Sequence, residues 1–430
     1  LSPDEIAVGV MALFLSGTYS FNMLIANTWR PGLSTLLAPT FWLTSDPEIF
    51  VRIGLVANAV IAGIGAMWLA RLGQRLTRLS GPGLVVTAIA VSVMPASLSA
   101  SSFVWAEPLI TLSFLASTWY VLRCYDDVTI GTCIAAIGWS LVGFTAHGRM
   151  LPFVVLVTGA VAAAALTKQR WKLSLSAVCF ALSGAILSAW YANFVFDAVW
   201  EVRTNDHTAG SVLSRLRRPV PVLQTALGQL WYLMVSTATL FGLGVYVLVR
   251  SATGHRRGVP KRADTVVLLV LTLPMLVMSI VFTSDRGRSD FFVYGRYNDA
   301  IVAPIIIVAA AWLVLESRSA LSRTWWWLVG GMSLLTLELG LLVNQLRGEA
   351  LAAGSEIPMI SGLQPLAGPG GSIDVIPATA AGLAISALLF WISRMHARPQ
   401  QLLAAAATTT LITAGVMAHR AFAPWLDGES

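Results

Sequence analysis

Long hydrophobic runs recur along the whole 430-residue chain, and short segments that contain charge, Gly or Pro separate them. The runs are continuous rather than alternating, which is typical of helices and not of barrel strands. The pattern therefore predicts an all-α protein, a polytopic transmembrane helical bundle with about twelve spans. The expected spans are residues 52–72, 83–99, 107–124, 129–146, 151–167, 173–193, 227–249, 265–284, 299–316, 324–345, 377–393 and 401–418.

The beginning of the chain has two interpretations. Asp4 and Glu5 stand directly before an apolar run, in a protein that otherwise avoids charge. In the first interpretation, residues 1–51 form an outer segment with interfacial helices, and a further span precedes residue 1. In the second, residues 6–25 are themselves a span, although this stretch contains Asn22 and several small polar residues.

The distribution of basic residues predicts the orientation. Alternate loops hold 16 of the 28 Lys and Arg residues, including all three lysines, and short loops of this kind are cytoplasmic. The other loops are longer and should face outward, together with Asp4 and Glu5. The net charge of +7 is thus explained by membrane orientation and does not indicate nucleic-acid binding.

The loops and spans divide the chain into six parts. These are an outer loop with the candidate acid at 1–51, a transmembrane core at 52–193, an outer loop at 194–226, transmembrane helices at 227–346, a Gly/Pro-rich outer loop at 347–376 and C-terminal helices at 377–430.

Polar residues gather at the outer ends of the predicted spans, as expected for a cavity at the membrane boundary. Each also has a structural interpretation, because first-turn acids stabilise helix starts and Arg or Tyr anchors span ends. The sequence contains no His-Glu-x-x-His motif, no paired-cysteine motif and no regularly spaced carboxylates that would predict a metal site. Two adjacent acids can still hold a hard cation, so the binding of a divalent metal stays an open question. The residues are Asp4, Glu5, Arg30, Glu107, His147, Arg149, Arg296 and Tyr297.

The order of several segments resembles the GT-C superfamily of membrane glycosyltransferases. The matching segments are "SPDE" at 2–5, the Pro-containing stretch at 30–60, "VWAEPLITLSFLAS" at 104–117, the Arg-bearing turn at 147–150 and "YGRYNDAIVAP" at 294–304. This superfamily includes protein O-mannosyltransferases, the lipid A aminoarabinose transferase and actinobacterial arabinosyl- and mannosyltransferases. The likeness is good over residues 1–165 and weakens towards the C-terminus.

The resemblance implies transfer of a hexose or pentose from a polyprenyl-phosphate donor to a glycan, lipid or protein acceptor, with inversion. Asp4 would be the general base and Glu5 would support it or bind the acceptor. Arg149 and Arg296, with Tyr297, would bind the donor phosphate. The expected place is a bacterial plasma membrane, with the site facing the extracytoplasmic side and serving the cell envelope.

Three further residues would complete the pocket that the resemblance implies. They are Glu107, His147 and Arg30.

Two other classes of function stay open at this point. One is a transporter or flippase of a lipid-linked saccharide, and the other is a non-catalytic membrane scaffold. A coupled carrier usually places several ionisable residues inside its spans, whereas here only Glu338 lies deep in one.

Overall fold

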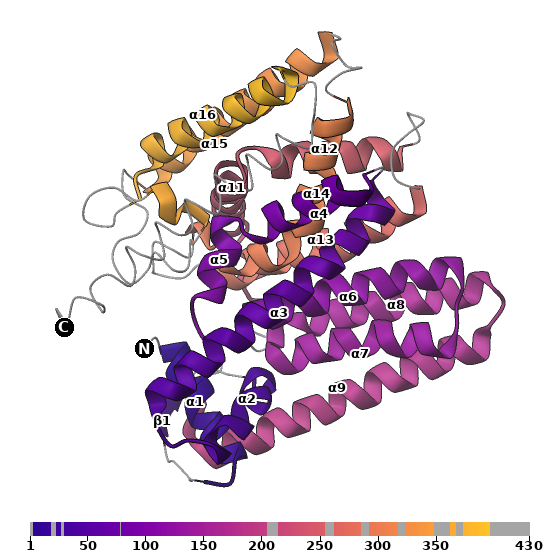
Figure 1. Cartoon of the computed structure of the whole chain (residues 1–430), viewed down its shortest axis with the longest axis vertical. Helices are drawn as coiled ribbons and strands as arrows, with labels where there is room; N and C mark the ends of the chain where they lie inside the picture. The colour runs from indigo at the N-terminus through magenta and orange to yellow at the C-terminus, as the bar shows by residue number, and fades with distance from the viewer. Residues whose placement is uncertain are drawn as a thin grey trace. The chain divides into compact units, whose positions relative to one another are not determined.

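The structure is a computed structural model of the whole chain (Figure 1). It describes residues 3–18, 23–26, 30–77, 79–203, 214–253, 262–284, 292–316, 323–347, 362–366 and 373–395. The predicted span at 401–418 lies outside these residues.

Helices occupy the predicted hydrophobic runs. Five described helices are long and apolar enough to cross a membrane, and two bent helix pairs raise that number to seven. This confirms a multi-pass helical membrane protein. The helices that coincide with predicted spans are α3 (Pro47–Leu76), α6 (Glu107–Asp126), α7 (Ile130–Ala146), α8 (Leu151–Thr167), α9 (Trp171–Val199), α13 (Arg262–Thr283), α14 (Arg296–Glu316), α15 (Arg323–Arg347) and α16 (Val375–Met395).

The span predicted at 227–249 is wrong as a single helix. Helices α11 (Pro219–Ser236) and α12 (Leu240–Ala252) meet there at 102°. Ala238 and Thr239 have φ angles of +47° and +64°, a left-handed conformation that ends a helix of L-residues. The Thr237 hydroxyl then accepts the Phe241 N–H at 3.0 Å and so satisfies a donor at the start of α12.

The run at 83–99 is also bent rather than straight. Helices α4 (Gly81–Ser92) and α5 (Pro95–Ser101) meet at 64°, immediately before Pro95, which disfavours helical geometry in the residue ahead of it.

The second interpretation of the chain start, a span over 6–25, is wrong. Helix α1 (Pro3–Leu15) ends after 13 residues, and strand β1 (Met23–Ala26) follows it. β1 pairs in parallel with β2 (Trp200–Arg203) in a two-stranded sheet that the sequence did not predict.

The described chain divides into two compact units. The first contains residues 1–68, 101–214 and 267–278, and the second contains 69–100, 215–266 and 279–430. The six-part division proposed from the sequence stays a prediction.

In the first unit, helices α6, α7, α8 and α9 pack side by side (Figure 1). Helix α1 contacts α9, α2 (Gly32–Leu37) and the 3-10 helix η1 (Ala38–Trp42). Val8 and Ala12 pack towards α2 and η1, whereas Ala7 and Met11 pack on the end of α9. Because both pairs have i, i+4 spacing, α1 is buried on two sides, and its first turn is held firmly in place.

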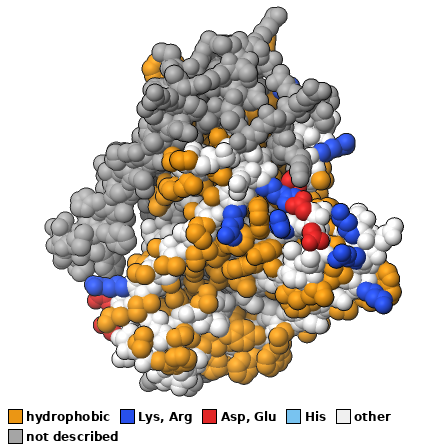
Figure 2. All heavy atoms as spheres, turned by 45° about the vertical axis from the view of Figure 1, so that its right-hand side comes forward, with side chains coloured by type: hydrophobic (Ala, Val, Ile, Leu, Met, Phe, Trp, Pro, Cys, Tyr) orange, Lys and Arg blue, Asp and Glu red, His pale blue; other side chains and the backbone are white. Residues whose placement is uncertain are grey.

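In the second unit, α12 packs on α14, and α11 packs on α15 and α16. An ion pair lies inside this unit, between Arg75 at the end of α3 and Asp264 at the start of α13. Hydrophobic side chains cover much of the described surface that Figure 2 shows, as expected of membrane-spanning helices.

Candidate functional site

The first turn of α1 carries the two adjacent acids. Glu5 is 8% exposed, and its Oε1 atom accepts the backbone N–H of Val104 at 3.1 Å. Asp4 is partly buried beside it. Helix N-termini favour carboxylates through the helix dipole and the N–H groups of the first turn.

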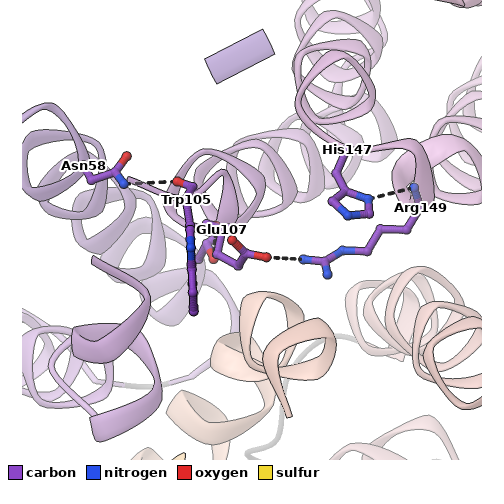
Figure 3. A network of polar contacts seen from close by, with 6 residues as sticks. Asn58, Trp105, Glu107, His147 and Arg149 are labelled. Carbon is purple, nitrogen blue, oxygen red and sulfur yellow. Dashed lines mark hydrogen bonds and ion pairs between the residues drawn. The ribbon is translucent and has the colours of Figure 1, made fainter. Parts of the chain in front are cut away.

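The segment that Glu5 contacts is fixed by Asn58 of α3. The Asn58 side-chain amide is fully buried and donates to the carbonyl oxygens of Phe103 at 2.7 Å and Trp105 at 3.0 Å (Figure 3). The rings of Phe103 and Trp105 stack with centroids 4.3 Å apart. This segment leads directly to Glu107, the first residue of α6, and its geometry therefore determines where that carboxylate lies.

Glu107 and Arg149 form a buried ion pair. Their side chains are 3% and 7% exposed, and Arg149 Nη2 lies 3.6 Å from Glu107 Oε1 (Figure 3). Arg149 comes from the 3-10 helix η2 (Gly148–Met150) between α7 and α8. His147 precedes this turn, and its Nδ1 atom accepts the Arg149 backbone N–H at 3.1 Å. His147 therefore shapes the turn that presents Arg149.

Arg30 lies beside the same turn. Its guanidinium donates to the Ser188 carbonyl at 3.3 Å and lies 4.1 Å from the centroid of the Phe144 ring. A Cβ atom placed on Gly148 would be 3.7 Å from Arg30 Nε. Burial lowers the pKa of Arg30 to about 10, so the side chain remains a cation at neutral pH.

The contacts within the first unit connect most of the predicted site residues. Val104 is three residues from Glu107, and three residues of chain span at most about 11 Å. The contact between Glu5 and Val104 thus places the α1 acids at the same end of this unit as Glu107. Arg149, His147 and Arg30 adjoin that carboxylate or its partner.

The charges of these residues do not balance. Asp4, Glu5 and Glu107 supply three carboxylates, and Arg30 and Arg149 supply two guanidinium groups.

Arg296 and Tyr297 belong to the second unit, at the start of α14. Arg296 is 8% exposed, and the Tyr297 ring makes an edge contact with Tyr294 at 4.6 Å between centroids. The Tyr297 contact with Tyr294 thus lies within the second unit.

A buried polar network that sequence reasoning missed lies next to Arg296. The Tyr232 hydroxyl donates to Asp299 Oδ2 at 2.7 Å. The Gln229 side chain donates to Thr283 and accepts from Asn298 at 3.0 Å. The polar residues of "ALGQLWYL" within an apolar run, and "ND" directly after "GRY", were the available signals.

In the part of the chain that the structure describes, no group of three or more His, Cys, Asp and Glu residues could hold a metal ion. A divalent cation at Asp4 and Glu5 would need ligands from a substrate or from water, since such ions take six or more oxygens or keep part of their water shell. The metal stays a prediction.

Comparison with known proteins rests on structure. No protein-family model matches the chain, and no curated protein matches its sequence. ArnT from Cupriavidus metallidurans bound to undecaprenyl phosphate is similar, with a TM-score of 0.56, 13% identity, and coverage of 97% of this chain and 73% of ArnT. Apo ArnT gives a TM-score of 0.51 at 15% identity, covering 97% of this chain and 72% of ArnT.

Arabinosyltransferase EmbB from Mycobacterium smegmatis is also similar in structure. The TM-score is 0.51 at 14% identity, and the match covers 96% of this chain but 40% of EmbB. Likeness at this level of identity shows a shared fold, and the polytopic helical fold expected from the sequence is confirmed. The chain is thus a polytopic helical membrane protein with the fold of ArnT and EmbB.

Proposed function

We propose that the chain is a membrane glycosyltransferase that uses a polyprenyl-phosphate-linked sugar as donor. It transfers the sugar, with inversion, to an acceptor hydroxyl on the extracytoplasmic side of a bacterial plasma membrane. The shared fold supports this proposal, and so does the name of one structural neighbour, an arabinosyltransferase. The other neighbour was solved with undecaprenyl phosphate bound.

The surroundings of the two acids favour different roles for them. The Glu5 carboxylate is buried and bonded to the Val104 backbone, so it positions the segment before α6. Asp4 precedes it in the same turn and is less buried, which makes it the better general base. Asp4 would take the acceptor's hydroxyl proton while that oxygen bonds to the anomeric carbon, and the bonding pair of the breaking C–O bond would leave with the lipid phosphate.

The departing phosphate needs fixed positive charge. Arg149 is the candidate in the first unit, because a guanidinium matches phosphate oxygens in a fork and because the site is shielded from water. Such preorganised groups contribute several kcal/mol to transition-state stabilisation. Arg296 and Tyr297 are proposed as further phosphate ligands.

One observation carries the proposal: the bond from Glu5 to Val104. It joins the first turn of α1 to the segment that ends in Glu107, and Glu107 is paired with Arg149. The candidate base, Asp4, thus adjoins in sequence the buried contacts that lead from Glu5 to the candidate phosphate ligand, Arg149.

The test is sugar transfer by the purified full chain in lipid vesicles, supplied with a panel of polyprenyl-phosphate sugars and with glycan, lipid and peptide acceptors. Release of polyprenyl phosphate by the wild type is expected with at least one donor, and Asp4→Asn should abolish most of it. Asp46→Asn is the matched control, because this exposed residue caps α3 through a bond to the Glu48 N–H that asparagine can also make.

The same assay distinguishes the rival functions. A flippase would move the lipid-linked sugar between leaflets without cleaving it, and a scaffold would do neither. Translocation without release of polyprenyl phosphate by the wild type would contradict the proposal.

A further inference from the structure

A groove lies between α7 and α9, at the opposite ends of these helices from the candidate site. Its volume is about 660 Å³, within the roughly 300–1,000 Å³ typical of ligand pockets. Helix α7 has 17 residues and is about 25 Å long, so the groove beginning at Ile130 is remote from His147 at the other end. The groove therefore does not belong to the candidate site.

The body of the groove is apolar. Ile137, Cys133 and Ala177 form a buried floor, each less than 5% exposed. Ile134 and Phe180 line it from α7 and α9 and are 49% and 39% exposed. Large apolar side chains left open on membrane-spanning helices are suited to hydrocarbon chains rather than to water.

The mouth of the groove is basic. Arg170, Trp171 and Lys172 line it where α8 turns into α9. Arg170 donates to the carbonyl of Val128 at 2.6 Å, which fixes one of its five N–H donors and holds the guanidinium at the mouth. The Lys172 ammonium lies 5.7 Å from the centroid of the Trp171 ring, which is 60% exposed.

The surrounding charges also favour an anion. At this end of α6–α9 the basic residues are Arg123, Lys168, Arg170 and Lys172, and the acids are Asp126 and Asp127. Four cations against two anions leave an excess of positive charge of two. Trp and basic residues together are typical of the membrane interface, where lipid phosphates lie.

We infer that this groove binds one anionic phospholipid from the leaflet around it. The lipid phosphate lies against Arg170 and Lys172, and an acyl chain follows the apolar groove between α7 and α9. Charge complementarity at the mouth and the apolar lining below it match the two ends of such a molecule. This inference is independent of the proposed enzyme activity.

The test is native mass spectrometry of the full chain with phosphatidylglycerol and phosphatidylcholine. The wild type should retain phosphatidylglycerol in preference to phosphatidylcholine. The double substitution Arg170→Gln with Lys172→Gln should weaken its retention roughly 25-fold, since each basic residue near an anionic lipid surface contributes roughly a five-fold gain. The matched control, Arg123→Gln with Lys168→Gln, removes two charges from the same end without touching the groove lining.

A second variant tests the acyl-chain part. Ser176→Trp would fill the groove from an exposed position on α9 while keeping both cations, and it should also reduce retention of phosphatidylglycerol. Three results would each overturn the proposal. The first is an equal loss of phosphatidylglycerol retention in the groove variant and in its charge-matched control. The others are a wild type that does not prefer phosphatidylglycerol to phosphatidylcholine, and full retention of phosphatidylglycerol by Ser176→Trp.

Discussion

Replacing Glu107 with Gln would remove the negative charge that lies 3.6 Å from the Arg149 guanidinium, which is 7% exposed. Glutamine keeps the size of the side chain and removes its charge, so the change tests the electrostatics rather than the packing. We expect a clear loss of stability, because the buried guanidinium would lose an attraction that compensates part of its lost hydration.

The magnitude follows from the geometry. At 3.6 Å and an effective dielectric constant of about 20, the Coulomb attraction between the two groups is about 4–5 kcal/mol. Breaking a buried pair from one side typically costs about 3–5 kcal/mol. Glu107→Gln should therefore destabilise the first unit by about 3 kcal/mol. Arg149→Met, which removes the other charge, should cost a similar amount.

The assay is a double-mutant cycle on thermal unfolding of the purified protein in one detergent. If the pair interacts as the structure indicates, the double variant Glu107→Gln with Arg149→Met should be more stable than the sum of the single losses implies, by about 2 kcal/mol or more. The reasoning would be refuted if each single variant lost less than about 1 kcal/mol of unfolding free energy and the double variant lost the sum of the two.

Three further changes test the packing around the site and in the second unit. Arg75→Gln should lower the free energy of unfolding by about 3 kcal/mol, because Arg75 donates to both oxygens of the buried Asp264 carboxylate at 2.9 and 2.8 Å. The control Arg52→Gln, which removes a charge from an exposed ion pair, should not shift the unfolding midpoint measurably. Asn58→Leu should lower the free energy of unfolding by about 2–4 kcal/mol, because it removes the donor to one buried and one half-buried carbonyl group. A changed tryptophan emission spectrum should accompany the loss. Gly32→Ala should lower the free energy of unfolding by about 1–3 kcal/mol, because a methyl group there would lie 2.6 Å from the backbone of α7. An unchanged unfolding midpoint would contradict that packing.

The hydrophobic pattern predicted the helices of this fold well, because length and continuity of apolar runs are properties of the local sequence. It did not predict the 102° bend at Ala238 and Thr239, since neither residue type is a usual signal for left-handed backbone. The pairing of β1 with β2 was equally invisible, because it joins segments about 180 residues apart through backbone bonds.

The candidate site was predicted in part. Polar residues are costly near a membrane, so Glu107 and Arg149 stood out individually, but only the structure shows that they pair. The resemblance gave Asp4 and Glu5 different roles, but no sequence feature predicted that Glu5 accepts the backbone N–H of Val104, 99 residues along the chain. Asn58 was missed, because one amide inside an apolar helix resembles any other until its two carbonyl partners are known.

The most direct measurement is the turnover rate of sugar transfer by Asp4→Asn, compared with wild type and with Glu5→Gln, in the reconstituted full chain. A general base contributes about 10²–10⁴-fold, so Asp4→Asn should lose at least a hundred-fold in rate with an unchanged unfolding midpoint. Glu5→Gln keeps an oxygen that can accept the Val104 N–H and removes only the charge, so it should lose less rate than Asp4→Asn. Transfer by Asp4→Asn within a few-fold of the wild type would contradict the assignment of Asp4 as the base.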